Sequence, residues 1–113
     1  MSIFDGFFQP RPLSSHGNPG GQQSVLLYLE GEDFDIMLQI SEKLTEAIES
    51  NKLGMFDGNE IGGNMTVLFM YGPDAELLFK HIEPILREDE FCRGAKAIIR
   101  WGGPGAPQRE VIL

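Results

Sequence analysis

Two stretches with helical spacing, separated by strand-like runs, constrain the fold of this chain most. In each stretch apolar side chains recur every three or four positions, which places them on one face of a helix. The two stripes are Met37, Ile40, Leu44, Ala47 and Ile48, and Ala75, Leu78, Phe79, Ile82, Ile85 and Leu86. The sequence therefore predicts two amphipathic helices. The first is expected to be capped near Asp33 and to run to about Ser50, and the second is expected to have Pro73 at its first helical position.

Short β-rich runs surround these helices. They cover residues 24–31, 53–61, 65–71, 95–101 and 109–113. Gly62 and Gly63 are expected to supply the positive φ angles of a hairpin turn, and Gly58 indicates a bulge. The order βαββαβ with an added C-terminal strand predicts an α+β fold, specifically a ferredoxin-like sandwich with two helices on one face of an antiparallel sheet. In that topology the first and third strands are central.

Length and composition fit one domain. Of the 113 residues, 24–113 are expected to form the domain and 1–23 an irregular N-terminal arm rich in proline and glycine. No run approaches the ~20 apolar residues of a membrane span, and the N-terminus lacks the basic start of a signal peptide. A single cysteine, Cys92, excludes an intrachain disulfide. The chain is expected in the cytoplasm.

The net charge of −8 is unevenly distributed. Residues 30–60 hold nine acids against Lys43 and Lys52, a distribution that repels phosphate backbones and argues against nucleic acid as a partner. On the first predicted helix the polar side chains recur at spacings of four and three, opposite the apolar stripe. They are Asp35, Gln39, Glu42, Glu46 and Glu49. This face is either a solvated surface or a docking surface for a basic partner.

A second candidate surface is the side of the sheet that faces away from the helices. With Val25, Leu27 and Leu29 directed to the core, the outward set is expected to comprise Leu26, Tyr28, Leu68, Met70 and Ile98. Such a face is too apolar to remain in contact with water. A second copy of the chain, the aromatic N-terminal arm, or another protein could cover it.

The stretch 54–64, GMFDGNEIGGN, places Asp57, Asn59 and Glu60 among glycines. A phosphate loop would lead into a helix, and here a strand follows. A turn with a bulge is the favoured interpretation, and a weak cation or polar-ligand site on these three residues is the alternative. Neither a cofactor nor a metal site is expected, and no catalytic residues are assigned. Acids near Cys92 would raise the pKa of its thiol, and His81 falls on a polar helix face.

Two motifs, FDGNE-G and YGPDA-x-x-LF-x-x-I-x-P-x-L, resemble those of small, uncharacterised bacterial proteins. The similarity covers residues 54–113. It implies a bacterial cytosolic origin and an α+β fold, and it carries no catalytic residues.

The sequence favours a non-catalytic protein-binding domain that is a homodimer or binds another, basic protein, in the manner of a small acidic immunity or inhibitor-like protein. The alternative is a small-molecule or cation-binding domain, or a weak enzyme, centred on Asp57, Asn59 and Glu60.

Overall fold

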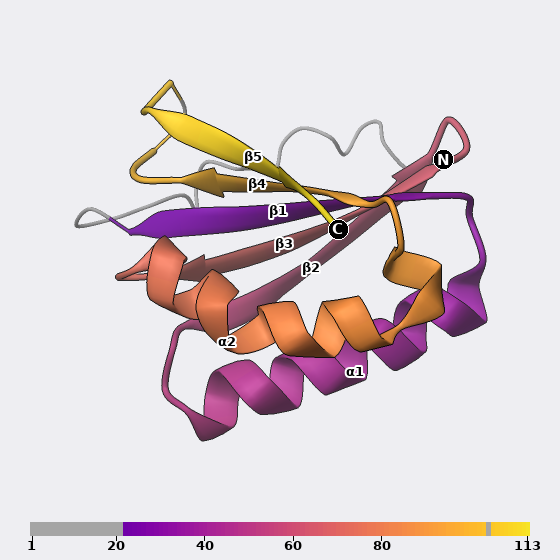
Figure 1. Ribbon diagram of the computed structural model, residues 1–113, viewed down its shortest axis with the longest axis horizontal. Coiled ribbons are helices and arrows are strands. Elements are labelled where there is room, and N and C mark those ends of the chain that lie inside the picture. The colour runs from indigo at the N-terminus through magenta and orange to yellow at the C-terminus, as the bar shows by residue number, and fades with distance from the viewer. Residues whose placement is uncertain (1–21, 104) are drawn as a thin grey trace.

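The computed structural model describes residues 22–103 and 105–113, so the predicted N-terminal arm lies almost entirely outside the described residues. Five strands and two α-helices are present in this part of the chain, with a short 3-10 helix, η3, after the second α-helix (Figure 1). The elements are β1 (Gln23–Glu30), α1 (Phe34–Ser50), β2 (Met55–Gly62), β3 (Met65–Gly72), α2 (Ala75–Glu88), η3 (Glu90–Cys92), β4 (Lys96–Arg100) and β5 (Gln108–Ile112).

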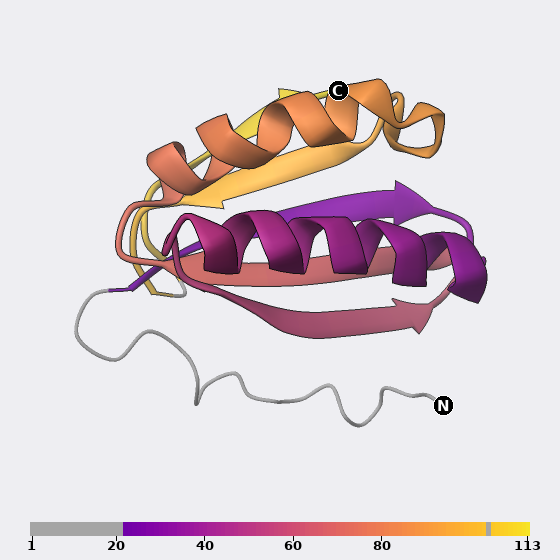
Figure 2. The same ribbon diagram turned by 90° about the horizontal axis from the view of Figure 1, so that it is seen from below.

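The strands form one antiparallel sheet in the order β2-β3-β1-β4-β5. Both α-helices pack on the same side of this sheet, as Figures 1 and 2 show from two directions. The predicted α+β class is confirmed. The strand order, with β1 and β3 inside the sheet and β5 added beside β4, is compatible with a ferredoxin-like arrangement.

Each α-helix begins at an aspartate that caps its first turn. The Asp33 carboxylate accepts a hydrogen bond from the backbone N–H of Ile36 (3.1 Å), and Asp74 accepts one from Leu77 (3.1 Å). These bonds satisfy donors that have no partner within the helix. The predicted position of Pro73 was therefore wrong, because α2 begins at Ala75 and the proline precedes the cap.

The hydrophobic core lies between the two helices and the sheet. From β1 it takes the inward residues Val25, Leu27 and Leu29, as the sequence predicts. Leu68 and Met70, predicted to face outward, are also part of this core and are 0% exposed. The strand register explains the error: Met70 lies opposite Val25 and Leu68 opposite Leu27. Directly paired residues share a face, so both side chains point toward the helices.

The β2–β3 hairpin closes one residue later than predicted. Gly63 (φ 60°) and Asn64 (φ 66°) hold the positive φ angles, whereas Gly62 belongs to β2. Asparagine tolerates this left-handed conformation better than most residues with a side chain. The Glu32 carboxylate accepts a hydrogen bond from the Asn64 backbone N–H (2.6 Å) and so ties the turn to the loop after β1.

Candidate functional site

The outer face of α1 is acidic along most of the helix. Its inner face places Met37, Ile40, Leu44 and Ile48 in the core, so positions half a turn away must face outward. These positions are the predicted polar stripe, and all of its members are exposed: Asp35, Gln39, Glu42, Glu46 and Glu49. The predicted face is therefore present, and its four carboxylates all come from one rigid element.

No cation within the described residues neutralises these four carboxylates by an ion pair. The only basic residue of α1 is Lys43, and its Nζ lies 3.7 Å from the Asp89 carboxylate just beyond the end of α2. The lysine therefore interacts away from the acidic stripe. Four uncompensated carboxylates on one helix face create a negative potential that attracts cationic groups.

A shallow groove of about 500 Å³ accompanies this acidic face. Leu38, Ser41 and Thr45 line it together with three of the stripe's glutamates, Glu42, Glu46 and Glu49, and with Ser50. Leu38 is 43% exposed. The surface thus combines an apolar strip with acidic neighbours, a composition that suits long basic side chains with aliphatic stems.

The sheet face opposite the helices is also apolar, but its composition differs from the prediction. Leu26 lies opposite both Ile98 and Phe69, and Tyr28 lies opposite both Lys96 and Val67. The correct outward residues of β3 are therefore Val67, Phe69 and Tyr71, in place of Leu68 and Met70. We call the set Leu26, Tyr28, Val67, Phe69, Tyr71 and Ile98 the open-face cluster. Lys96 borders it, with its Nζ 5.4 Å from the centre of the Tyr28 ring.

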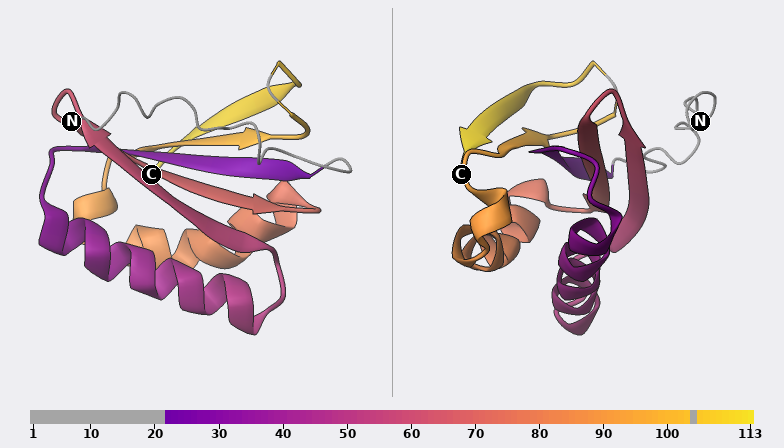
Figure 3. Two further views of the ribbon diagram at one scale, coloured as in Figure 1. Left: turned by 180° about the vertical axis from the view of Figure 1, so that it is seen from behind. Right: turned by 90° about the vertical axis from the view of Figure 1, so that its right-hand side faces the viewer.

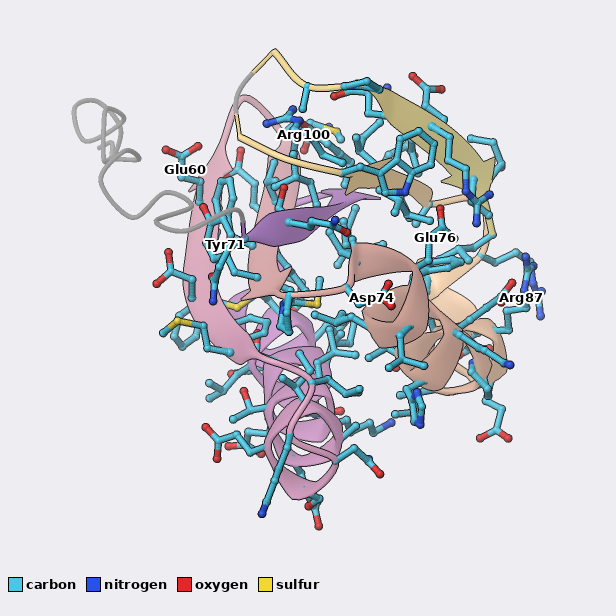
Figure 4. All side chains as sticks on the ribbon, turned by 90° about the vertical axis from the view of Figure 1, so that its left-hand side faces the viewer. Glu60, Tyr71, Asp74, Glu76, Arg87 and Arg100 are labelled. Atoms are coloured by element: carbon cyan, nitrogen blue, oxygen red, sulfur yellow. The ribbon has the colours of Figure 1, made fainter. Side chains whose placement is uncertain are left out.

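Asp57, Asn59 and Glu60 lie on β2, an outer strand of the sheet. The predicted bulge is present, because the register of β2 against β3 shifts between Phe56 and Gly58. Asn59 pairs with Leu68 and Glu60 with Val67, so these two side chains belong to opposite faces of the sheet. Figure 4 shows Glu60 on the β2 side of the molecule, far from Glu76. The geometry thus separates two of the three residues proposed for a shared ligand site.

A cluster that sequence reasoning missed joins α2 to the last strand. The Glu76 carboxylate accepts hydrogen bonds from Arg109 Nε and Nη2 (both 2.8 Å) and from Trp101 Nε1 (3.0 Å). In Figure 4 Glu76 extends from the first turn of α2 toward β5. These hydrogen bonds, those from Arg109 above all, hold the pKa of Glu76 below its ordinary value, although burial opposes the shift. No sequence signal links Glu76 to Trp101 and Arg109, which lie 25 and 33 positions further along the chain.

The only cysteine is poorly suited to act as a nucleophile. Cys92 is fully buried at the end of η3, and burial raises the pKa of its thiol to about 11, with a smaller contribution from the neighbouring Asp89. The direction agrees with the sequence-based expectation, but burial rather than acidic neighbours is the main cause. A thiol with so high a pKa holds almost no reactive thiolate at neutral pH.

A second cavity, of about 580 Å³, lies where the end of β1 meets the start of β4. Tyr28, Glu30, Glu90, Arg93 and Lys96 contribute polar groups to its lining, and Phe91 contributes an exposed ring. Acids and bases occur there in equal number. Among the described residues, His, Cys, Asp and Glu side chains nowhere gather in threes that could hold a metal ion.

Comparisons with protein-family models, with curated proteins and with solved structures give no match for this chain. The functional argument therefore depends on the geometry of the chain itself. Of the helices in residues 22–103 and 105–113, none has the length and apolar character that a membrane span requires.

Proposed function

We propose that this chain is a non-catalytic protein-binding domain of the ferredoxin-like class, and that the acidic face of α1 docks a basic protein. The observation that carries the proposal is the set of four exposed carboxylates without an ion-pair partner in the described residues: Asp35, Glu42, Glu46 and Glu49. The exposed Leu38 and the groove beside it support the proposal, because they offer an apolar contact next to the charges.

Charge complementarity of this kind acts mainly on the rate of association and on the choice of partner. The partner fitted by α1 carries lysine or arginine side chains spaced along about 25 Å, the length of a helix of this size. Its association is expected to slow as ionic strength rises, because salt screens exposed charges. A small acidic immunity or inhibitor-like protein, which covers a basic target, is the concrete form of this function.

The proposed setting is the bacterial cytoplasm. A single free thiol that is buried in the core supports it.

The test compares the full-length chain with the variant Glu42→Gln/Glu46→Gln/Glu49→Gln. Each immobilised protein is exposed to bacterial lysate, the retained proteins are identified, and the association rate of the most strongly retained one is measured at several salt concentrations. We expect the most strongly retained protein to be basic. Its association rate should be roughly tenfold lower with the variant than with the unmodified chain, and roughly tenfold lower at high salt than at low salt.

The matched control, Glu30→Gln/Glu90→Gln/Glu110→Gln, removes the same charge from exposed positions outside α1. It should associate nearly as fast as the unmodified chain. Equal rates for both variants would show that net charge, and not the face of α1, governs binding. A retained protein without basic character would contradict the proposal.

A further inference from the structure

The two outer strands of the described sheet, β2 and β5, differ in the edge that they present. The edge of β2 is interrupted by the bulge between Phe56 and Gly58, a feature that discourages pairing with a further strand. β5 pairs with β4 in unbroken register from Gln108 to Ile112, and it contains neither a bulge nor a proline. Of the two edges, β5 is therefore the one suited to accept another strand.

The hydrogen bonds around β5 show which of its backbone groups point away from β4. The backbone N–H of Leu113 donates to the Ala95 carbonyl (2.9 Å), and that of Trp101 donates to the Pro107 carbonyl (3.0 Å). In an antiparallel pair such positions alternate with positions whose N–H and C=O groups point to the other side. Three residues of β5 therefore direct both groups outward, and we call them the outward residues: Gln108, Glu110 and Ile112. No strand within residues 22–103 and 105–113 pairs with this side of β5.

The side chains along this edge do not block it. Arg109 is a charged residue that could shield an edge, but its hydrogen bonds to Glu76 (both 2.8 Å) hold it against α2. Gln108 and Glu110 are exposed, and Ile112 is 61% exposed, the highest value among the large hydrophobic residues that the structure describes. An exposed isoleucine beside unpaired backbone groups offers another strand both hydrogen bonds and apolar contact.

We propose that β5 accepts an extended segment of another protein as an added antiparallel strand, with a lysine or arginine opposite Glu110 and an apolar residue opposite Ile112. Each outward residue then exchanges N–H and C=O hydrogen bonds with the segment, and the side chains opposite determine which segments fit. Glu110 has no ion pair within the described residues. A cation directly across from it compensates its charge.

A second copy of this chain fits the same edge less well. Two β5 strands that pair through all their outward residues must place Glu110 of one chain opposite Glu110 of the other. Like charges directly opposite one another destabilise a strand pair. Each chain also carries a net charge of −8, so two copies repel one another. Both effects are reversed for a basic segment, which is therefore the favoured occupant.

This edge is separate from the acidic face of α1. In the right-hand view of Figure 3, β5 (yellow) lies at the upper left and α1 at the bottom, and β5 and β2 form opposite edges of the sheet. The variant Glu42→Gln/Glu46→Gln/Glu49→Gln should consequently bind an added strand as tightly as the unmodified chain does. The proposed function and this inference can fail separately.

The test measures amide hydrogen exchange in the full-length chain and its mass by light scattering. The amides of the outward residues should exchange faster than those of Arg109 and Val111, because only the latter two bond to β4. Slow exchange at the outward residues in a dimeric chain would overturn the proposal in favour of a second copy. The same result in a monomer would show that the edge is already covered, and would overturn it too.

The probe for binding is the peptide acetyl-Val-Val-Lys-Thr-Thr-amide, whose residues face Ile112 to Gln108 in antiparallel register. Its titration to millimolar concentration should shift the amide signals of the outward residues most. Replacing the peptide lysine with glutamate should weaken binding severalfold, because it places two carboxylates opposite one another. No shift at these amides, or equal binding of the two peptides, would contradict the proposal.

Two N-methylated peptides separate strand pairing from other modes of binding. A methyl group on the lysine nitrogen removes the N–H that faces the Glu110 carbonyl, and binding should weaken about tenfold or more. The matched control carries the methyl group on the next residue, a threonine whose N–H points away from β5, and it should bind nearly as tightly as the parent peptide. Equal losses for the two methylated peptides would rule out an added strand in this register.

Discussion

Arg109 on β5 and Glu76 on the first turn of α2 form a two-point ion pair, with Nε–Oε2 and Nη2–Oε1 distances of 2.8 Å. The pair connects the added strand β5 to α2, and η3 and β4 lie between these two elements in the chain. Trp101, beyond the end of β4, donates to the same carboxylate. A single glutamate therefore holds together three segments that the sequence gives no reason to associate.

We expect Glu76→Gln to lower the melting temperature at pH 7 by a few degrees at most, because both partners are partly exposed and such pairs are weak. The pKa of Glu76 is lower in the folded than in the unfolded chain. Its stabilisation is therefore present above the ordinary glutamate pKa and is lost as the pH falls through the folded value. Thermal unfolding of both proteins at pH 7 and pH 3 should show a smaller difference at pH 3 than at pH 7.

The control for this experiment is Glu88→Gln, which removes the same charge from an exposed position of α2 that has no ion-pair partner in the described residues. It should not lower the melting temperature at either pH. A decrease of equal size in the two variants would show that the Arg109 contact contributes nothing specific.

Replacing Leu44 with alanine should destabilise the domain strongly. The Leu44 side chain is 0% exposed in the middle of the α1 stripe, and leucine-to-alanine changes in cores cost about 2–5 kcal/mol. Leu38→Ala, on the same helix but 43% exposed, should cost less than about 1 kcal/mol. Urea unfolding, monitored by circular dichroism, measures the loss of stability in each variant. Similar losses in the two variants would mean that α1 does not bury the face assigned to it.

Gly72→Ala tests the close approach of two chain segments. A Cβ at this position would lie 2.1 Å from the Leu53 carbonyl oxygen, a backbone atom that cannot rotate away. We expect a loss of stability above the ~1 kcal/mol typical of point substitutions, or no folded protein at all. In Gly63→Asn the new side chain meets open space at a φ of 60°, which asparagine tolerates, so this control should fold normally. A fully stable Gly72→Ala protein would contradict the backbone placement.

Cys92 should resist thiol reagents in the folded protein. Its burial, and a pKa raised to about 11, keep it protonated and inaccessible at pH 8. Modification by a chromogenic disulfide should be on the order of 100-fold slower than in urea-unfolded protein, where the thiol has an ordinary pKa. Rapid modification of the native protein would show that the η3 region opens readily.

Local patterns determined the elements of this protein and their order. The apolar stripes of α1 and α2, the capping position of Asp33 and the bulge at Gly58 were all predicted from neighbouring residues, because helices, caps and bulges depend on contacts only a few positions apart. The acidic face of α1 was predicted for the same reason, because the buried stripe of a helix determines which of its residues face outward.

Tertiary structure alone decided which face each strand presents and which distant residues meet. Nearly every side chain of β3 is apolar, so the alternation of apolar and polar residues could not show whether Leu68 or Val67 points inward. The pairing of β3 with β1 determines that Leu68 does. The contacts among Glu76, Trp101 and Arg109 depend on strand order, a non-local property that residue spacing does not encode.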